Sequence, residues 1–195
     1  MKRTLLSLTA ALSLAVAAPA LAQSSNNGTT GKAVGTSAMQ NDAAPKPAPQ
    51  NVKTAANFVP MAAVSNSFEI ESSNLALQKS KSQAVHDFAK TMVNDHSAAG
   101  DKLKAAVKQS KMDVAVPNGL DARHKQMLND LQAAPSDSFD AKYIQMQSKA
   151  HDEAVALFTA YSKNGEKGPI REFATKTLPT LKQHKQMVQK LQNNS

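Results

Sequence analysis

The sequence predicts an all-α protein: an antiparallel four-helix bundle with a short extra helix between the second and third long helices. Three observations support this fold class. From residue 54 onward, apolar side chains recur every three or four positions, which is the period of an amphipathic helix. Four such segments are each about 25 residues long, a length that suits a bundle. Sustained alternation of apolar and polar residues, which is typical of strands, is missing from the sequence.

Residues 1–22 have the three parts of a secretory signal peptide. A basic start is followed by the apolar run LLSLTAALSLAVAA and by Ala-Leu-Ala at residues 20–22, a pattern that signal peptidase cleaves. We therefore expect the mature chain to begin at Gln23. The alternative is an uncleaved anchor over residues 5–22, which the alanine content and the small-residue site disfavour. No later stretch is long and apolar enough to span a bilayer, so we expect no transmembrane segment after cleavage.

An export signal without any cysteine indicates a periplasmic protein. The sequence offers neither a disulfide framework nor a cysteine for lipid attachment, so packing alone must stabilise the fold. Removing the basic pair Lys2 and Arg3 with the leader lowers the formal net charge from +8 to +6. The lysines are spread along the helices, which is typical of solvated helix faces, and they also allow weak association with anionic envelope surfaces. A nucleic-acid partner is not expected, because no aromatic stacking platform accompanies the basic residues.

The segment from residue 23 to residue 53 is predicted to be a disordered linker. It is rich in Ser, Asn, Gly and Thr and then in Pro and Ala, with almost no large apolar side chain. Such a composition cannot bury enough surface to offset the entropy lost on ordering. The folded domain is therefore expected over residues 54–193.

The first two long helices are predicted over residues 54–80 and 83–110. Pro60 lies near the start of the first, where proline is best tolerated. Ser82 is the expected N-cap of the second, and the segment MDVAVPNG ends it. A short helix is then predicted over residues 121–133, with Asp121 as its N-cap.

The last two long helices are predicted over residues 138–163 and 169–192. Asn164-Gly165 ends the third long helix, and Pro169 opens the fourth, which Pro179 is expected to bend. Tight turns join the first helix to the second and the third to the fourth. In an up-down-up-down bundle both turns would lie at the same end.

Each long helix places at least one polar residue on or beside its apolar stripe. At 100° per residue, Glu69 lies about 20° from Phe58 in the first helix. The other inward polar residues are Asp95, His96, His151 and His184. Glu69 and the three histidines lie at similar distances from their tight turns, within roughly 9 Å along the axis for a rise of about 1.5 Å per residue. The sequence therefore predicts one polar layer across the bundle.

Two interpretations of this layer remain open on sequence alone. Neutral imidazoles with one or two carboxylates suit Zn, Fe or Cu, and bundle interiors are where such sites are built. On this interpretation the metal ligands are Glu69, Asp95, His96, His151 and His184. The alternative is a metal-free hydrogen-bonded network in which a carboxylate accepts from a histidine, in a structural, interaction or stress-related protein of the cell envelope.

The sequence does not favour an enzyme. A nucleophile elbow, a glycine-rich anion loop and P-loop spacing are all missing from it. A metal-dependent oxidoreductase would need open coordination positions, and nothing in the sequence requires them.

The chain resembles a bacterial exported family catalogued as domain of unknown function 4142, a predicted outer membrane protein family placed with the ferritin-like four-helix bundles. The matching pieces are FVPMAAVSNSFEIESSNLALQKS, VHDFAKTMVNDHSAAGDKLKAAV, FDAKYIQMQSKAHDEAVALF and FATKTLPTLKQH. They lie between Phe58 and Leu191, in this order. The resemblance implies a ferritin-like bundle independently of the periodicity, and it brings no activity with it.

A di-iron site is not expected despite this resemblance. Di-iron members of the ferritin-like class use Glu-x-x-His on two of their helices. The residues three positions before the bundle histidines are Val93, Ser148 and Leu181, so these elements are missing. Two possibilities therefore remain: a site for a single metal ion, or a set of polar positions that is kept without a metal.

Overall fold

The computed structural model describes residues 46–194 of the chain. The predicted signal peptide and residues 23–45 of the predicted linker lie outside these residues. The described part contains five α-helices, a short 3-10 helix and no β-strand, so the predicted fold class is confirmed. None of the described helices is long and apolar enough to cross a membrane.

The helix boundaries agree closely with those predicted. The 3-10 helix η1 spans Pro49–Asn51, and the four long helices are α1 (Ala55–Lys79), α2 (Gln83–Ser110), α4 (Phe139–Asn164) and α5 (Pro169–Asn193). The short helix α3 (Ala122–Gln132) lies in the connection between α2 and α4. Each predicted boundary lies within one residue of the observed one, and both α1 and α5 continue through their internal prolines.

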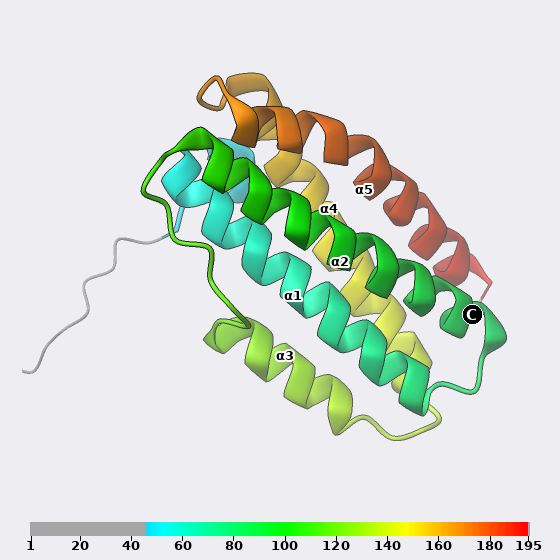
Figure 1. The fold of residues 1–195 in the computed structure, drawn as a ribbon. Coiled ribbons are helices and arrows are strands. Elements are labelled where there is room, and N and C mark those ends of the chain that lie inside the picture. Colours follow the sequence, from blue (N-terminus) through cyan, green and yellow to red (C-terminus); the bar gives the residue numbers. More distant parts are fainter. Residues whose placement is uncertain (1–45, 195) are drawn as a thin grey trace, which may run out of the picture. The chain divides into compact units, whose positions relative to one another are not determined.

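The four long helices form a ring in which each neighbouring pair is antiparallel. Helix α1 packs against α2 and α4, and α5 packs against the same two helices from the opposite corner. Helix α3 lies outside the ring, against α1 and α4 (Figure 1). This is the arrangement that positions the central polar layer described below.

The two tight turns lie at opposite ends of the bundle, and the prediction that they share one end is wrong. One apolar cluster joins the start of α1 to the end of α4 and the start of α5. The other joins the end of α1 to the starts of α2 and α4 and the end of α5. The reason is the connection between α2 and α4, which with α3 runs back along the bundle, so that α4 starts beside the α1–α2 turn (Figure 1).

Local capping explains several of the helix ends. Ser82 accepts a hydrogen bond from the Val85 amide at 3.4 Å, and Asp121 accepts one from the His124 amide at 3.0 Å, so both predicted N-caps are confirmed. Glu166, in the turn between α4 and α5, accepts a hydrogen bond from the Ala55 amide at 2.6 Å. A carboxylate at the first turn of α1 also interacts favourably with the helix dipole.

Residues 46–53 contact the bundle. Helix η1 packs against α4, and the side chain of Val52 is fully buried. The end of the predicted linker thus lies against the domain in the described structure, while the division into leader, linker and domain stays a prediction.

Candidate metal centre

Three histidines meet in the middle of the bundle, between the two apolar clusters. The ring centroids of His96 and His151 lie 5.8 Å apart, those of His96 and His184 lie 5.4 Å apart, and those of His151 and His184 lie 5.5 Å apart. One ring nitrogen from each residue lies within 4.8 Å of the other two. We call His96, His151 and His184 the three-histidine cluster.

Sequence position explains why these rings converge. Each histidine lies near the middle of its helix and continues the buried stripe: His96 follows Met92 by four residues, and His184 follows Leu181 by three. Residues near the middle of a helix lie at the same height whichever way the helix runs. The cluster therefore forms even though the two tight turns lie at opposite ends.

Each histidine is held from outside by an oxygen atom. His151 Nδ1 contacts the main-chain carbonyl of Gln147 at 2.9 Å, and His184 Nε2 contacts Asp95 Oδ2 at 2.9 Å. His96 Nδ1 contacts Asn66 Oδ1 at 3.1 Å. A carbonyl or carboxylate oxygen only accepts, so each of these ring nitrogens carries the proton and donates it outward.

The other nitrogen of each ring is buried without a hydrogen-bond partner. Among the described residues, His96 Nε2, His151 Nε2 and His184 Nδ1 have none. An unpaired buried polar atom costs about 1–3 kcal/mol. Three such atoms in one cluster call for a functional explanation, because buried polar groups in proteins are almost always paired. Each presents a lone pair, because the proton is on the opposite nitrogen.

Burial keeps all three rings neutral. It lowers the pKa of His151 to about 4, with a smaller lowering by the charge of His184, and hydrogen bonding to Gln147 opposes the shift. It also lowers the pKa of His96 well below its usual range, with further lowering from the two neighbouring histidines. The pKa of His184 is lowered by burial as well, against the opposing effect of Asp95. Neutral imidazole is the form that binds metal ions.

Glu69 lies beside the cluster as a buried acid. Its Oε1 is 3.8 Å from His151 Nδ1, and its side chain is 1% exposed. Burial raises the pKa of Glu69 to about 8, and the nearby amide of Gln147 offsets part of that rise. Neither carboxyl oxygen makes a hydrogen bond within the described residues. At neutral pH this group is therefore mostly protonated and uncharged.

The geometry suits a small ion held by nitrogen. Bonds of about 2.0–2.1 Å to imidazole place two ligand nitrogens about 3.3–3.6 Å apart in a tetrahedral or trigonal site. In the cluster, one nitrogen of each ring lies within 4.8 Å of the other two. Binding an ion therefore requires the rings to close inward, a shift that rotation about the side-chain bonds can supply.

The structure divides the five predicted site residues into two groups. It brings His96, His151 and His184 together. Of these three histidines, Glu69 forms a close contact with His151, at 3.8 Å. Asp95 contacts His184 from the outside, with its side chain 46% exposed. Sequence reasoning missed Asn66. The available signal was its position three residues before Glu69, which places both on one face of α1.

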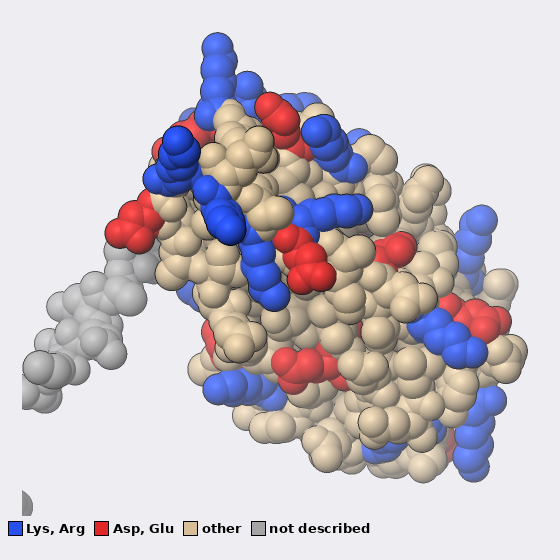
Figure 2. All heavy atoms as spheres, viewed as in Figure 1, with Lys and Arg blue, Asp and Glu red and all other residues tan. Residues whose placement is uncertain are grey.

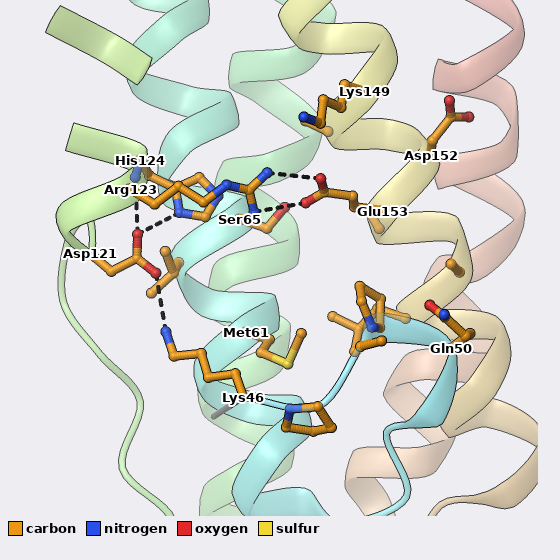
Figure 3. Close-up of a pocket in the computed structure, with 18 of the residues that line it drawn as sticks. Lys46, Gln50, Met61, Ser65, Asp121, Arg123, His124, Lys149, Asp152 and Glu153 are labelled. Carbon is orange, nitrogen blue, oxygen red and sulfur yellow. Dashed lines mark hydrogen bonds and ion pairs between the residues drawn. The ribbon is translucent and has the colours of Figure 1, made fainter. Parts of the chain in front are cut away.

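A surface groove of about 880 Å³, called the larger groove below, lies between α1, α3, α4 and residues 46–50 (Figure 3). Four of its six Lys, Arg, Asp and Glu side chains pair with one another. Lys46 contacts Asp121 at 3.1 Å, Arg123 donates to both carboxyl oxygens of Glu153 at 3.1 and 2.8 Å, and His124 contacts Asp121 at 2.7 Å. The three-histidine cluster does not line this groove, so the two features are separate.

Comparisons with known proteins agree with this fold. The model of the family described as "Domain of unknown function (DUF4142)" matches residues 39–191. The solved structure titled "CopM in the Cu(II)-bound form" is similar, with a TM-score of 0.61 and 19% sequence identity. The likeness covers 73% of this chain and 99% of that chain, and at this identity it shows the fold alone. The comparison with curated proteins gave no match.

Proposed function

The chain belongs to the family of domains of unknown function known as DUF4142, and we propose that it binds one transition-metal ion, preferably Cu(II), through His96, His151 and His184. The observation that carries the proposal is the pairing pattern of the three rings. Each ring donates outward to an oxygen, and the remaining nitrogen of each is buried without a partner among the described residues. Proteins commonly hold metal-binding histidines in this way.

The metal-free network explains these contacts less well. The hydrogen bond between His184 and Asp95 is one that a network would also contain. A network would, however, pair the inner nitrogens too, because each unpaired one is costly. A metal ion would satisfy all three nitrogens at once, which supports the metal over the network.

Copper is favoured over zinc and iron on two grounds. Imidazole suits Zn, Cu and Fe, and for a given set of ligands the affinity of divalent ions peaks at Cu(II). The similar fold solved in a Cu(II)-bound form is a second support. A di-iron centre finds no support, because the buried carboxyl of Glu69 is the only buried acidic side chain among the described residues.

We assign Asp95 and Glu69 roles outside the ligand set. Asp95 orients His184 and favours its inner nitrogen as a ligand, because a carboxylate hydrogen bond raises the basicity of the ring. Glu69 is a weaker candidate than its position suggested, since its Oε1 approaches His151 at Nδ1, 3.8 Å away. That nitrogen donates to Gln147, whereas the unpaired nitrogen of His151 is Nε2. The protein's role would then be to hold the ion, without catalysis.

The location of the protein remains a proposal from sequence. We propose that residues 1–22 direct export to the periplasm and that residues 23–53 tether the domain. Figure 2 shows Lys and Arg side chains gathered near the end of the bundle where α2 ends and α5 begins, with acidic side chains among them. Such a mixed surface supports weak association with anionic envelope surfaces.

Metal titration of the chain purified from residue 23 tests the proposal. We expect one Cu(II) per chain by elemental analysis, and an electron paramagnetic resonance spectrum with nitrogen hyperfine splitting. His96→Ala, His151→Ala and His184→Ala should each abolish tight binding. His86→Ala and His124→Ala remove histidines outside the cluster and should retain it. If the wild-type chain binds no copper, zinc or iron after reconstitution, the proposal is wrong and the network interpretation stands.

A further inference from the structure

A surface groove of about 380 Å³ runs along the seam between α2 and α5. Small side chains line much of it: Ala98, Ala99, Ala105 and Ala106 from α2, with Thr177 and Thr180 from α5. Asp95 also lines this groove, and its carboxylate contacts His184 at 2.9 Å. The groove therefore reaches the outer edge of the three-histidine cluster.

A second, much smaller cavity of about 20 Å³ lies inside the bundle beside His96. Its lining includes polar side chains, His96, Ser65, Asn66 and Thr177, among apolar ones. A space above about 10–15 Å³ with two or more polar partners can hold a water molecule. This cavity is therefore large enough for one water-sized species next to a proposed ligand.

The groove and the cavity share three lining residues, Ala99, Phe173 and Thr177. These three side chains form the wall between the surface and the cavity. Phe173 is the largest of them and is 7% exposed, while Ala99 and Thr177 are half-buried. A rotation of one aromatic side chain can connect the two spaces, because its neighbours in the wall are small.

We propose that this α2–α5 groove is the route by which a solvent-borne cation reaches the cluster, with Ala99, Phe173 and Thr177 as its gate. The inference rests on the proposed metal binding, and it deepens that proposal by naming the path of entry. Asp95, with its half-exposed carboxylate, gives an incoming cation a first contact in the groove. The larger groove in Figure 3 also shares two lining residues with the cavity, Ser65 and Ala154. Asp95, the carboxylate that contacts His184, lines the α2–α5 groove and not the larger one.

The charges of the groove are consistent with this assignment. Glu172 and Lys176 line it and lie 3.7 Å apart, so they largely compensate each other. Asp95 and Lys102 are the remaining charged side chains of the lining. The groove is thus close to neutral as a whole, and its negative charge nearest to the cluster is that of Asp95.

An obstructing variant with a matched control tests the gate. Ala99→Leu adds bulk to the shared wall, whereas Ala98→Leu adds the same bulk to the groove alone. Stopped-flow loading of metal-free chain with Cu(II) can be followed by quenching of tyrosine fluorescence, since the chain has two tyrosines and no tryptophan. We expect Ala99→Leu to slow loading by about tenfold or more, a barrier increase of about 1.4 kcal/mol, with Ala98→Leu within about twofold of wild type.

An opening variant should act in the reverse direction. Phe173→Leu shortens the largest side chain of the gate and keeps an apolar residue in the core, so we expect faster loading and faster release. A gate changes both rates together, so the affinity for Cu(II) should stay the same in all three variants. Equal loading rates in Ala99→Leu and Ala98→Leu would overturn the proposed route.

A metal-free measurement separates this inference from the proposed function. Exchange of the imidazole Cε1 hydrogen with deuterated water, read by mass spectrometry, reports solvent access to His96. Ala99→Leu should slow that exchange relative to Ala98→Leu, and equal exchange in the two variants contradicts the route. Failure of the wild-type chain to bind Cu(II) would instead contradict the metal site, while the exchange result still decides whether the groove leads to His96.

Discussion

His184 lies between an exposed carboxylate and a buried cluster: its Nε2 donates to Asp95 Oδ2 at 2.9 Å, while its Nδ1 is buried without a partner among residues 46–194. The side chain of Asp95 is 46% exposed and that of His184 is 3% exposed. One residue thus connects the surface of the bundle to its central polar layer. Because Asp95 is exposed and contacts His184, its substitution tests metal binding by the cluster without changing a buried side chain.

Replacing Asp95 by alanine should weaken metal binding without abolishing it. Loss of an outer hydrogen bond to a metal-binding histidine typically costs about 10–100-fold in affinity. We therefore expect the Kd for Cu(II), measured by competition with a chelator, to rise by that factor with one ion still bound. Asp101→Ala removes an exposed carboxylate from the same helix and should leave the Kd unchanged. An equal effect of both changes would point to surface charge rather than to the His184 contact.

Gly100→Ala should disturb the partner of His96. A Cβ at residue 100 would lie 3.0 Å from Asn66 Nδ2, so the Asn66 amide must shift from its position opposite His96 Nδ1. We expect Cu(II) affinity to fall severalfold, while the melting temperature of the metal-free chain rises, because alanine is favoured over glycine in a helix by about 1 kcal/mol.

The double variant checks this mechanism. If Gly100→Ala acts through Asn66, its effect on affinity should disappear in an Asn66→Ala background, since the two changes then remove the same contact. Additive losses would show that Gly100 acts by another path.

The pKa of Glu69 makes stability depend on pH in a defined direction. The group ionises near 4.5 in the unfolded chain and near 8 in the folded one, so the folded state loses stability as pH rises from about 4.5 to about 8. Glu69→Gln removes this loss. At about 1.4 kcal/mol per unit, the variant should gain up to about 5 kcal/mol over wild type near pH 9 and little at pH 4.5. Urea unfolding of the metal-free chain at several pH values measures it, and a pH-independent difference would contradict the assignment.

The histidines should release a bound metal only in acid. Protons compete with a metal for imidazole below the pKa of the ring, and burial lowers the pKa of His151 to about 4. We expect the bound fraction of Cu(II) to stay constant from pH 8 to about 5 and to fall as the pH approaches 4. Equilibrium dialysis against a metal buffer corrected for pH measures this. Release centred near pH 6.5, the value for an exposed histidine, would show that the rings are not desolvated.

Much of the fold could be predicted because its signals are local. Helix α2 is an example: its apolar stripe marks its buried face, Ser82 marks its start and the segment MDVAVPNG marks its end. Each signal lies within about one turn of the feature that it marks. The prediction of 83–110 for this helix matches the structure. The direction of α4 was predicted wrongly, because no local signal shows whether the connection through α3 turns back at once or runs along the bundle.

The candidate site was predictable only in outline. Helical periodicity is enough to place His96, His151 and His184 inward and near mid-helix, because side-chain direction follows from backbone position. Which nitrogen of each ring faces inward depends on partners from elsewhere in the fold: Asn66 on α1 for His96, and Asp95 on α2 for His184. Periodicity also could not separate Glu69 from the cluster, since a difference of a few ångströms depends on side-chain rotamers and packing. The helices and their buried faces thus follow from the chain alone, whereas the proton positions around the cluster arise only when four helices pack together.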